Sequence, residues 1–177
     1  MYVAGLWGFA EATLFFLVPD IWLTAIAVRR GLKPALIACL VALAGALVGG
    51  MAMYGWGASD PEAARATLNW IPAIDMTLMD QVRAALDEDG ASAIMLGPLQ
   101  GIPYKIYAIE ASRAGIGLAI FMAISIPARL LRFLLVTIIA WSISAALTQH
   151  AGTRVRTGLL AAAWCAFYAA YFTIMGI

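Results

Sequence analysis

Two arginines, Arg129 and Arg132, lie near the middle of residues 114–147, a stretch of 34 residues that contains no other charged side chain. One charge at the centre of a membrane helix costs from about 3 to more than 10 kcal/mol, so two persist there only when something compensates for them. Residues three apart share one face of a helix, which places both guanidinium groups on the same side. The chain must therefore fold so that this face meets anionic groups or a water-filled cavity instead of lipid.

The composition indicates that the rest of the chain also belongs in a membrane. Of the 177 residues, 64% are apolar and 12% are charged, whereas a soluble domain is about one quarter charged. Residues 34–54 and 157–177 each run for 21 residues without a charge, which is enough to span about 30 Å of hydrocarbon. Together with residues 114–147, they predict an all-α integral membrane protein with three transmembrane helices.

Charges outside these segments are distributed unequally, which predicts an orientation. Residues 56–90 are strongly acidic, with seven Asp or Glu against two Arg. Positively charged loops stay on the cytoplasmic side, so the acidic segment is expected outside. Within it, residues 61–70 and 77–88 predict an amphipathic pair of helices at the outer surface. Basic residues cluster before the first and the last predicted span and are expected to be cytoplasmic: Arg29, Arg30, Lys33, Arg154 and Arg156.

Residues 3–28 are apolar but too short for two spanning helices, and Val18, Pro19 and Asp20 interrupt them. Proline lacks a backbone donor and disfavours helix in the residue before it. The segment therefore predicts a re-entrant hairpin of two half-helices, with Glu11 in the first half. Asp20 is expected at the turn or as the N-cap of the second half, where its carboxylate would accept backbone N–H groups.

Residues 91–113 repeat this design, because Pro98, Gly101 and Pro103 break an apolar run into halves of about ten residues each. Each hairpin is followed by a predicted span, and the two hairpins enter from opposite sides, so the sequence predicts an inverted repeat. Inverted repeats with broken helices are typical of transporters, because freed backbone groups and helix ends form a site near the midplane. The alternative is a membrane assembly or structural factor whose hairpins only pack.

The first predicted span contains the G-x-x-x-G pair Gly45 and Gly49, which lets another backbone approach closely. We expect its partner to be a hairpin of the same chain. The alternative partner is a second protomer, which would make the protein a homo-oligomer.

The sequence lacks the signatures of common enzymes and metal sites. It contains no G-x-S-x-G, no H-E-x-x-H and no P-loop. Cys39 and Cys165 fall in different predicted spans, which favours two buried apolar thiols over a disulfide or a metal site. The lone His150 has no second ligand at a suitable spacing. We therefore predict no enzymatic activity, no metal, no cofactor and no nucleic-acid partner.

Ionisable side chains within the apolar segments are the candidate functional residues. If the hairpin tips meet, five of them converge on one polar pocket: Glu11, Asp20, Lys105, Arg129 and Arg132. The three cations, together with Gln100 near the second break, are predicted to bind an anionic head group, because a guanidinium fork fits phosphate oxygens and a lysine adds a point charge. Glu11 and Asp20 are predicted to couple to protons, because carboxyl groups held between desolvation and nearby cations can take up and release them.

The same five residues have another interpretation, in which they neutralise one another as structural ion pairs. Two further charged residues, Glu110 and Arg113, are candidates of second rank. They lie three apart near a predicted helix end, and this spacing favours a local ion pair at the interface.

Four segments carry a family resemblance. They are GFAEATLFFLVPDIWLTAIAVRRG, which contains Glu11, Pro19 and Asp20, the glycine-rich ALAGALVGGMAMYGWG, GPLQGIPYKIYAIEASRAG with its P-Y-K motif, and ARLLRF. Together they resemble the DedA family, also called the VTT or SNARE-associated membrane family, and in particular its small bacterial P-Y-K branch. Larger members have an F-x-R-F-x-P-G-x-R pattern in the second hairpin, where this chain has Gln100 and Lys105.

The resemblance implies a multi-pass protein of the bacterial inner (plasma) membrane that moves lipid across the bilayer. The family recycles undecaprenyl phosphate in bacteria, couples transport to the proton-motive force, and includes eukaryotic relatives that scramble phospholipids. We therefore expect a transporter or flippase of an anionic lipid, either a polyprenyl phosphate or a phospholipid, with protons as the coupling ion.

Overall fold

The computed structural model describes residues 1–97, 100–149 and 151–175, and within them all regular structure is helical. In chain order the elements are α1 (Tyr2–Ala12), α2 (Asp20–Arg30), α3 (Leu32–Ser59), α4 (Pro61–Leu68), α5 (Met76–Asp89), α6 (Ser92–Leu96), α7 (Tyr104–Arg113), α8 (Leu118–Ala146), a 3₁₀ turn (Leu147–Gln149) and α9 (Thr153–Met175).

Three helices in the described part of the chain are long and apolar enough to cross a membrane, as the sequence predicted. They are α3, α8 extended by its 3₁₀ turn, and α9. The α8 helix begins at Leu118 and not at residue 114, because Gly115 adopts a φ of 71° and Gly117 is extended. Glycine takes such a positive φ without the steric penalty of a Cβ, so it separates α7 from α8.

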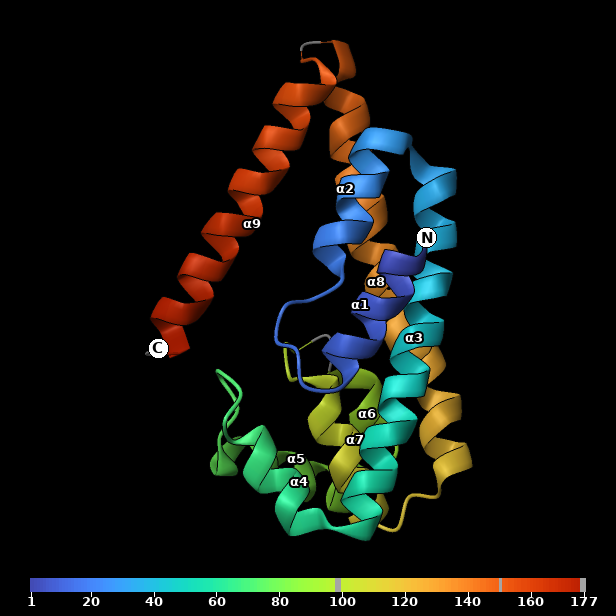
Figure 1. Ribbon diagram of the computed structural model, residues 1–177, viewed down its shortest axis with the longest axis vertical. Helices are drawn as coiled ribbons and strands as arrows, with labels where there is room; N and C mark the ends of the chain where they lie inside the picture. Colours follow the sequence, from blue (N-terminus) through green and yellow to red (C-terminus); the bar gives the residue numbers. More distant parts are fainter. Residues whose placement is uncertain (98–99, 150, 176–177) are drawn as a thin grey trace.

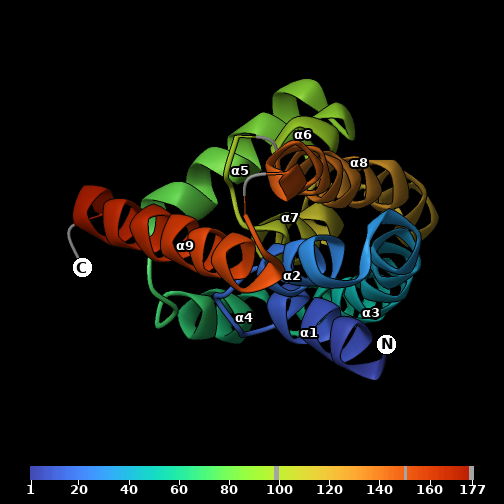
Figure 2. The same cartoon turned by 90° about the horizontal axis from the view of Figure 1, so that it is seen from above.

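The long helices α3 and α8 contact each other and support the shorter helices (Figures 1 and 2). The α1 helix packs along α3, while α2 contacts both α3 and α8, and α7 packs mainly on α3 and α5. The α2–α3 and α8–α9 connections lie at one end of the molecule, and α4 and α5 lie towards the other (Figure 1). The basic clusters and the acidic segment are therefore separated along the long axis of the molecule.

The first pair of short helices, α1 and α2, is interrupted over residues 13–19, a break that includes Val18 and Pro19 as predicted but begins earlier and leaves Asp20 in α2. Pro19 is the N-cap residue of α2, and Asp20 is the first helical residue. The Asp20 carboxylate caps no backbone N–H group and instead accepts a hydrogen bond from Arg132. The N-cap prediction was wrong because a charge-assisted bond to a guanidinium is stronger than a bond to a neutral amide.

The second pair, α6 and α7, is less symmetrical than the sequence predicted. The α6 helix has 5 residues and α7 has 10, so the expectation of two equal halves was wrong. Gly101 has a φ of 85°, and Pro103 is an extended N-cap residue of α7. Gly101 and Pro103 therefore belong to the non-helical connection between α6 and α7. Pro98, the other residue predicted to break this segment, lies outside the described residues.

The glycine pair of α3 packs against α1, which confirms that its partner is a segment of the same chain. A Cβ on Gly45 would overlap the carbonyl oxygen of Gly5, and a Cβ on Gly49 would lie 2.8 Å from the carbonyl oxygen of Phe9. The two backbones therefore touch along one face of each helix. This close approach keeps Glu11, near the end of α1, next to the middle of the bundle.

Gly45→Ala is expected to lower the free energy of unfolding by about 1–3 kcal/mol, because an added methyl group must push α1 away from α3. Gly55→Ala in the same helix is the matched control, since nothing lies within 4 Å of its added Cβ. Unfolding of both variants in detergent micelles would measure the difference. Equal stability of the two variants would contradict the tight α1–α3 contact.

The acidic segment forms α4 and α5, close to the predicted ranges 61–70 and 77–88. Asp60 caps α4 by accepting from Ala63 N at 3.0 Å, and Asp75 caps α5 by accepting from Leu78 N at 2.7 Å. Their inner faces join α6 and α7 in one apolar core through buried side chains that include Leu68, Met79, Val82 and Leu86. The outer helices are thus a packed part of the protein.

The last helix, α9, packs mainly on α2 and diverges from α8 towards its C-terminal end (Figure 1). Cys39 is buried in α3, as predicted, but Cys165 on α9 is exposed, so the prediction of two buried thiols was half wrong. Among the described residues, no second helix covers that face of α9, which leaves the thiol exposed.

Candidate functional site

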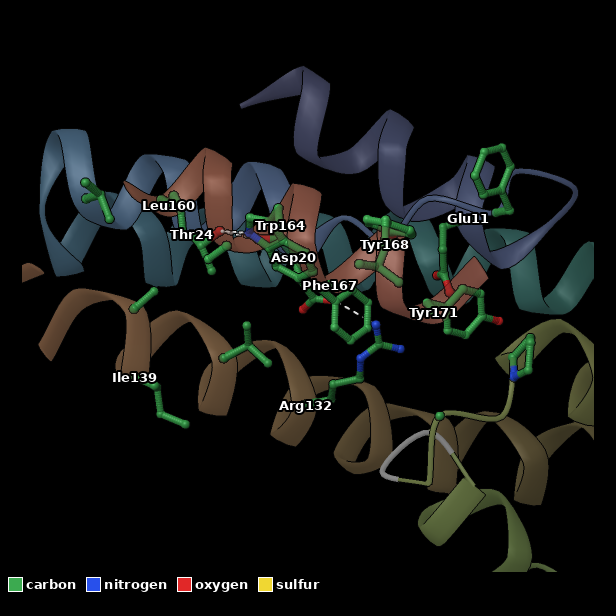
Figure 3. Close-up of a pocket in the computed structure, with 18 of the residues that line it drawn as sticks. Glu11, Asp20, Thr24, Arg132, Ile139, Leu160, Trp164, Phe167, Tyr168 and Tyr171 are labelled. Atoms are coloured by element: carbon green, nitrogen blue, oxygen red, sulfur yellow. Dashed lines mark hydrogen bonds and ion pairs between the residues drawn. The ribbon is translucent and has the colours of Figure 1, made fainter. Parts of the chain in front are cut away.

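A cavity of about 910 Å³ lies between α2, α8, α9 and the two interhelical breaks (Figure 3). This volume is near the upper end for small-molecule sites, which range from about 300 to 1,000 Å³. Its lining is polar at one end, mostly apolar along its length, and polar again at the far end, where Ser144 and Arg156 lie. The end near the interhelical breaks is lined by five polar residues that the sequence predicted as site residues: Glu11, Asp20, Gln100, Lys105 and Arg132.

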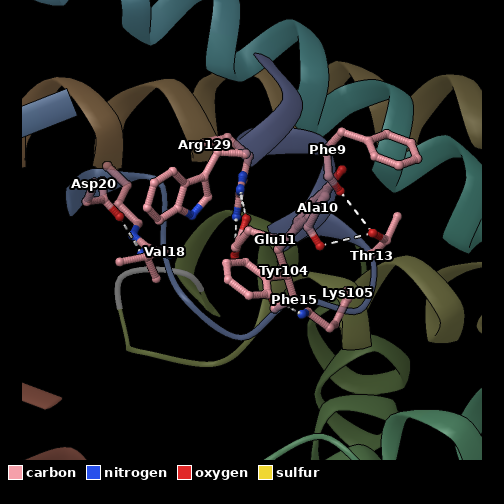
Figure 4. Close-up of polar contacts among 12 residues, drawn as sticks. Phe9, Ala10, Glu11, Thr13, Phe15, Val18, Asp20, Tyr104, Lys105 and Arg129 are labelled. Carbon is pink, nitrogen blue, oxygen red and sulfur yellow. Dashed lines mark hydrogen bonds and ion pairs between the residues drawn. The ribbon is translucent and has the colours of Figure 1, made fainter. Parts of the chain in front are cut away.

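Arg129 and Glu11 form an ion pair behind the wall of the cavity (Figure 4). Arg129 is completely buried, and its two terminal nitrogens donate to the two carboxylate oxygens of Glu11. The Arg129 guanidinium also lies over the rings of Tyr104, 4.7 Å from the centroid, and Phe133, 5.0 Å from the centroid. Charge pairing and aromatic contacts thus compensate for burying this arginine.

Asp20 and Arg132 form the second pair and face the cavity (Figure 3). Arg132 Nη2 donates to Asp20 Oδ2 at 2.7 Å, and 19% of the Arg132 side chain remains exposed. The other oxygen, Asp20 Oδ1, is buried and has no hydrogen-bond partner among the described residues. One hydrogen bond therefore joins the pair. Arg132 keeps donors, and Asp20 keeps one oxygen, that could bind a further group.

Lys105 has a different environment from the two arginines. Its side chain is 2% exposed, and its Nζ donates to the carbonyl oxygen of Phe15 at 2.7 Å (Figure 4). That carbonyl is accessible because Phe15 lies in the non-helical connection between α1 and α2. Within the described parts of the chain, Lys105 forms no ion pair with a carboxylate. The three cations and two carboxylates leave the polar end with one excess positive charge.

The apolar walls of the cavity come from facing surfaces of α8 and α9. Each surface spans 16 residues, from Arg132 to Leu147 on α8 and from Arg156 to Tyr171 on α9, so its ends lie 15 helical rises or roughly 22 Å apart at 1.5 Å per residue. The α8 wall is aliphatic and the α9 wall is largely aromatic. The main side chains of the α8 wall are Val136, Ile139, Ala140 and Ile143. Those of the α9 wall are Leu160, Trp164, Phe167, Tyr168 and Tyr171.

Two hydrogen bonds tie α9 to the first helix pair and so fix one side of the cavity. Trp164 Nε1 donates to Thr24 Oγ1 at 3.0 Å, and the Tyr168 hydroxyl accepts from Val18 N at 3.0 Å. Arg156 joins α9 to α8 at the far end by donating to the Ser144 carbonyl at 3.1 Å. A few hydrogen bonds thus hold the α9 wall of the cavity against the first helix pair and α8.

Not every predicted site residue reaches the cavity. Arg129 lies behind Glu11 and does not line it. Glu110 and Arg113 lie on the side of α7 that faces α4, where they form the predicted ion pair at 3.1 Å. Glu110 is completely buried and also accepts from Arg65 Nη1 at 2.8 Å. These residues connect α7 to α4 and take no part in the polar end of the cavity.

Arg65 extends this outer network, because it pairs with both Glu110 and Asp80. Burial alone would lower the pKa of the Arg65 guanidinium, but its hydrogen bonds and charge interactions with the two carboxylates outweigh burial and raise that pKa above its ordinary value. Arg65 therefore stays charged and holds α4 and α5 against α7.

The sequence-based predictions missed two groups of residues that shape the site. The aromatic wall of α9 has helical spacing, with Trp164, Phe167, Tyr168 and Tyr171 at positions i, i+3, i+4 and i+7, and this signal could have been recognised. Tyr104 gave no comparable signal. It stacks on Arg129 and donates to Ser125 Oγ at 2.9 Å, a contact that depends on the packing of α7 against α8.

The chemistry of the cavity suits an amphipathic anion. Its polar end provides a lysine, an arginine and an amide as donors, and its long walls provide apolar surface. Among the described residues, no group of three or more His, Cys, Asp or Glu side chains could hold a metal ion, and His150 lies outside those residues. Comparison of the chain with protein-family models, with curated proteins and with solved structures found no match.

Proposed function

We propose that this protein transports an anionic lipid across the membrane. The head group would bind at Lys105, Arg132 and Gln100, and the chain would lie along the apolar walls between α8 and α9. The observation that carries the proposal is the combination, in one cavity of about 910 Å³, of a positively charged end and apolar walls roughly 22 Å long. A small hydrophilic anion would need only the first of these.

Lys105 and Arg132 are better placed than Arg129 to bind a phosphate. Both line the cavity, whereas Arg129 is enclosed and already holds both oxygens of Glu11. Lys105 donates to a neutral carbonyl, so an anion would meet a cation that has no carboxylate partner in the described structure. Arg132 has donors that Asp20 does not use, since the pair is joined by one hydrogen bond.

Asp20 is the better supported of the two predicted proton-coupling residues. It shares Arg132 with the proposed phosphate site, and its Oδ1 has no donor in the described structure. Protonation of Asp20 would weaken its hold on Arg132 and free that guanidinium for the lipid phosphate, so protons and lipid would be linked through one residue. Glu11 is bound through both oxygens and lines the same end.

The finer architecture belongs to the same proposal. We place α1–α2 and α6–α7 as re-entrant hairpins of opposite orientation, with their breaks near the midplane and with the basic end of the molecule in the cytoplasm of a bacterial cell. The broken helices, their convergence on the cavity and the separation of basic and acidic ends support this arrangement. The resemblance of the four sequence segments to the DedA family points the same way.

The proposal is tested by reconstituting the protein in vesicles that contain tail-labelled phosphatidylglycerol, phosphatidylcholine or a polyprenyl phosphate, with and without a proton gradient. Wild type should carry at least one anionic lipid and carry phosphatidylcholine more slowly. Arg132→Gln should reduce the rate at least tenfold, because its charge is at the polar end. Arg30→Gln is the matched control, since Arg30 is exposed at the end of α2.

Absence of lipid movement by a folded wild-type protein would exclude the transport proposal. Copurification of a stable protein partner, combined with no transport, would favour the alternative of a membrane assembly factor. Equal rates for Arg132→Gln and Arg30→Gln would show that the cavity is not the route.

A further inference from the structure

The connection between α4 and α5 carries an exposed tryptophan in an otherwise acidic part of the molecule. Trp70 is 89% exposed, and Pro72 and Met76 beside it are exposed as well. The surrounding helices present Asp and Glu to the same exterior. A large aromatic side chain this accessible is unusual on a surface that faces only water.

The connection holds Trp70 outward because its neighbours are anchored inward. Ile71 is 9% exposed and Ile74 is 5% exposed, and both belong to the core formed by α4 to α7. Ile71 N donates to Leu68 O at 2.9 Å, and Ile74 N donates to Ile71 O at 3.1 Å, which gives the connection a defined turn. Trp70 is therefore presented by a folded platform.

The position of this connection is at the level of the membrane-spanning helices. The connection projects from α4 and α5 towards the C-terminal end of α9, and both views place it beside that part of α9 (Figures 1 and 2). In Figure 1 it therefore lies above the lower ends of α3 and α8. Ile71, Pro72 and Ile74 also line the cavity to which Tyr168 and Tyr171 of α9 contribute. The tip therefore lies beside α9, which is one of the three helices long and apolar enough to cross a membrane.

We propose that the Trp70–Ile74 connection is a membrane anchor whose Trp70 side chain lies in the interfacial region of the outer leaflet. Tryptophan is enriched at this depth, because its ring is apolar and its indole N–H still reaches water or head groups. The occupant of the Trp70 surface is therefore lipid. The anchor fixes α4 and α5 against the bilayer and makes residues 71–74 one edge of the cavity mouth, whatever the cavity carries.

A fluorophore at position 70 tests this proposal. Trp70→Cys is made in a Cys165→Ala background, which leaves Cys39, a fully buried thiol, as the other cysteine. The new thiol is labelled with an environment-sensitive nitrobenzoxadiazole probe. The protein is reconstituted at about one copy per vesicle in phosphatidylcholine and phosphatidylglycerol, with and without lipids that carry a nitroxide quencher near the head-group end of the chain. Glu62→Cys, on the exposed surface of α4, is the matched control.

The expected result is a blue-shifted emission at position 70 that the nitroxide lipids quench, together with unshifted and unquenched emission at position 62. Equal, water-like emission at both positions would overturn the proposal. A blue shift that appears only at high protein density, without quenching by lipid, would show that a second copy covers Trp70 and would also overturn it. The readout requires no transport, so it stands apart from the test of the proposed function.

Discussion

Replacing Arg129 by methionine should lower the free energy of unfolding by about 3–5 kcal/mol, because it leaves the carboxylate of Glu11 in the interior without its partner. Methionine keeps most of the side-chain volume, so the loss reports on charge more than on a cavity. Arg129 is completely buried and bonds to both oxygens of Glu11. Denaturant unfolding in detergent micelles would measure the loss.

The double variant Glu11→Gln/Arg129→Met separates pairing from packing. It removes both charges and should recover most of the stability lost in the single variant, since a neutral amide is far less costly to bury than an unpaired carboxylate. If the double variant were as unstable as Arg129→Met, the ion pair would not be the cause. A transport defect in Arg129→Met would accordingly reflect the fold as well as the site.

Replacing Lys105 by methionine should have the opposite signature, with lipid transport lost and stability unchanged or raised by on the order of 1 kcal/mol. Lys105 is buried and makes one hydrogen bond, to the Phe15 carbonyl, so its charge is costly to the folded state. If the cavity binds an anion as proposed, the charge of Lys105 would be compensated on binding. The measurements are the vesicle transport rate and the unfolding curve of the same preparation.

Lys33→Met is the control for Lys105→Met, because Lys33 is exposed near the start of α3 and is not among the residues that line the cavity. It should leave both transport and stability near those of wild type. Transport by Lys105→Met at the wild-type rate would remove Lys105 from the proposed phosphate site. A severe loss of stability would show instead that Lys105 serves to hold the connection between α1 and α2.

Several features of the fold followed from local sequence. The three apolar helices were predicted from long runs with few or no charges, and α4 and α5 from their amphipathic pattern. The capping roles of Asp60 and Asp75 were not predicted. The packing of Gly45 against a hairpin of the same chain was also predicted, because a small residue on a membrane helix lets another backbone approach closely, and the structure shows that this partner is α1. Each of these depends on composition within one or two turns.

The polar cluster was only partly predictable. Burial of a charge in an apolar helix is so costly that Arg129 and Arg132 were expected to meet anionic groups or a water-filled cavity, and Glu11 and Asp20 were candidate partners. The sequence did not specify which arginine takes which carboxylate. Packing of α1 and α2 against α8 made that choice, so that Arg129 is enclosed with Glu11 while Arg132 and Asp20 face the cavity.

The sequence by itself therefore determined the membrane class, the positions of the long helices and the need for a polar centre, because these follow from the transfer energies of individual side chains. The tertiary structure decided that Lys105 donates to the Phe15 carbonyl, that aromatic side chains of α9 line the cavity and that Trp70 is exposed. These depend on the distances and angles between helices that are far apart in the chain, and such distances are set by packing over the whole bundle and not by any local pattern.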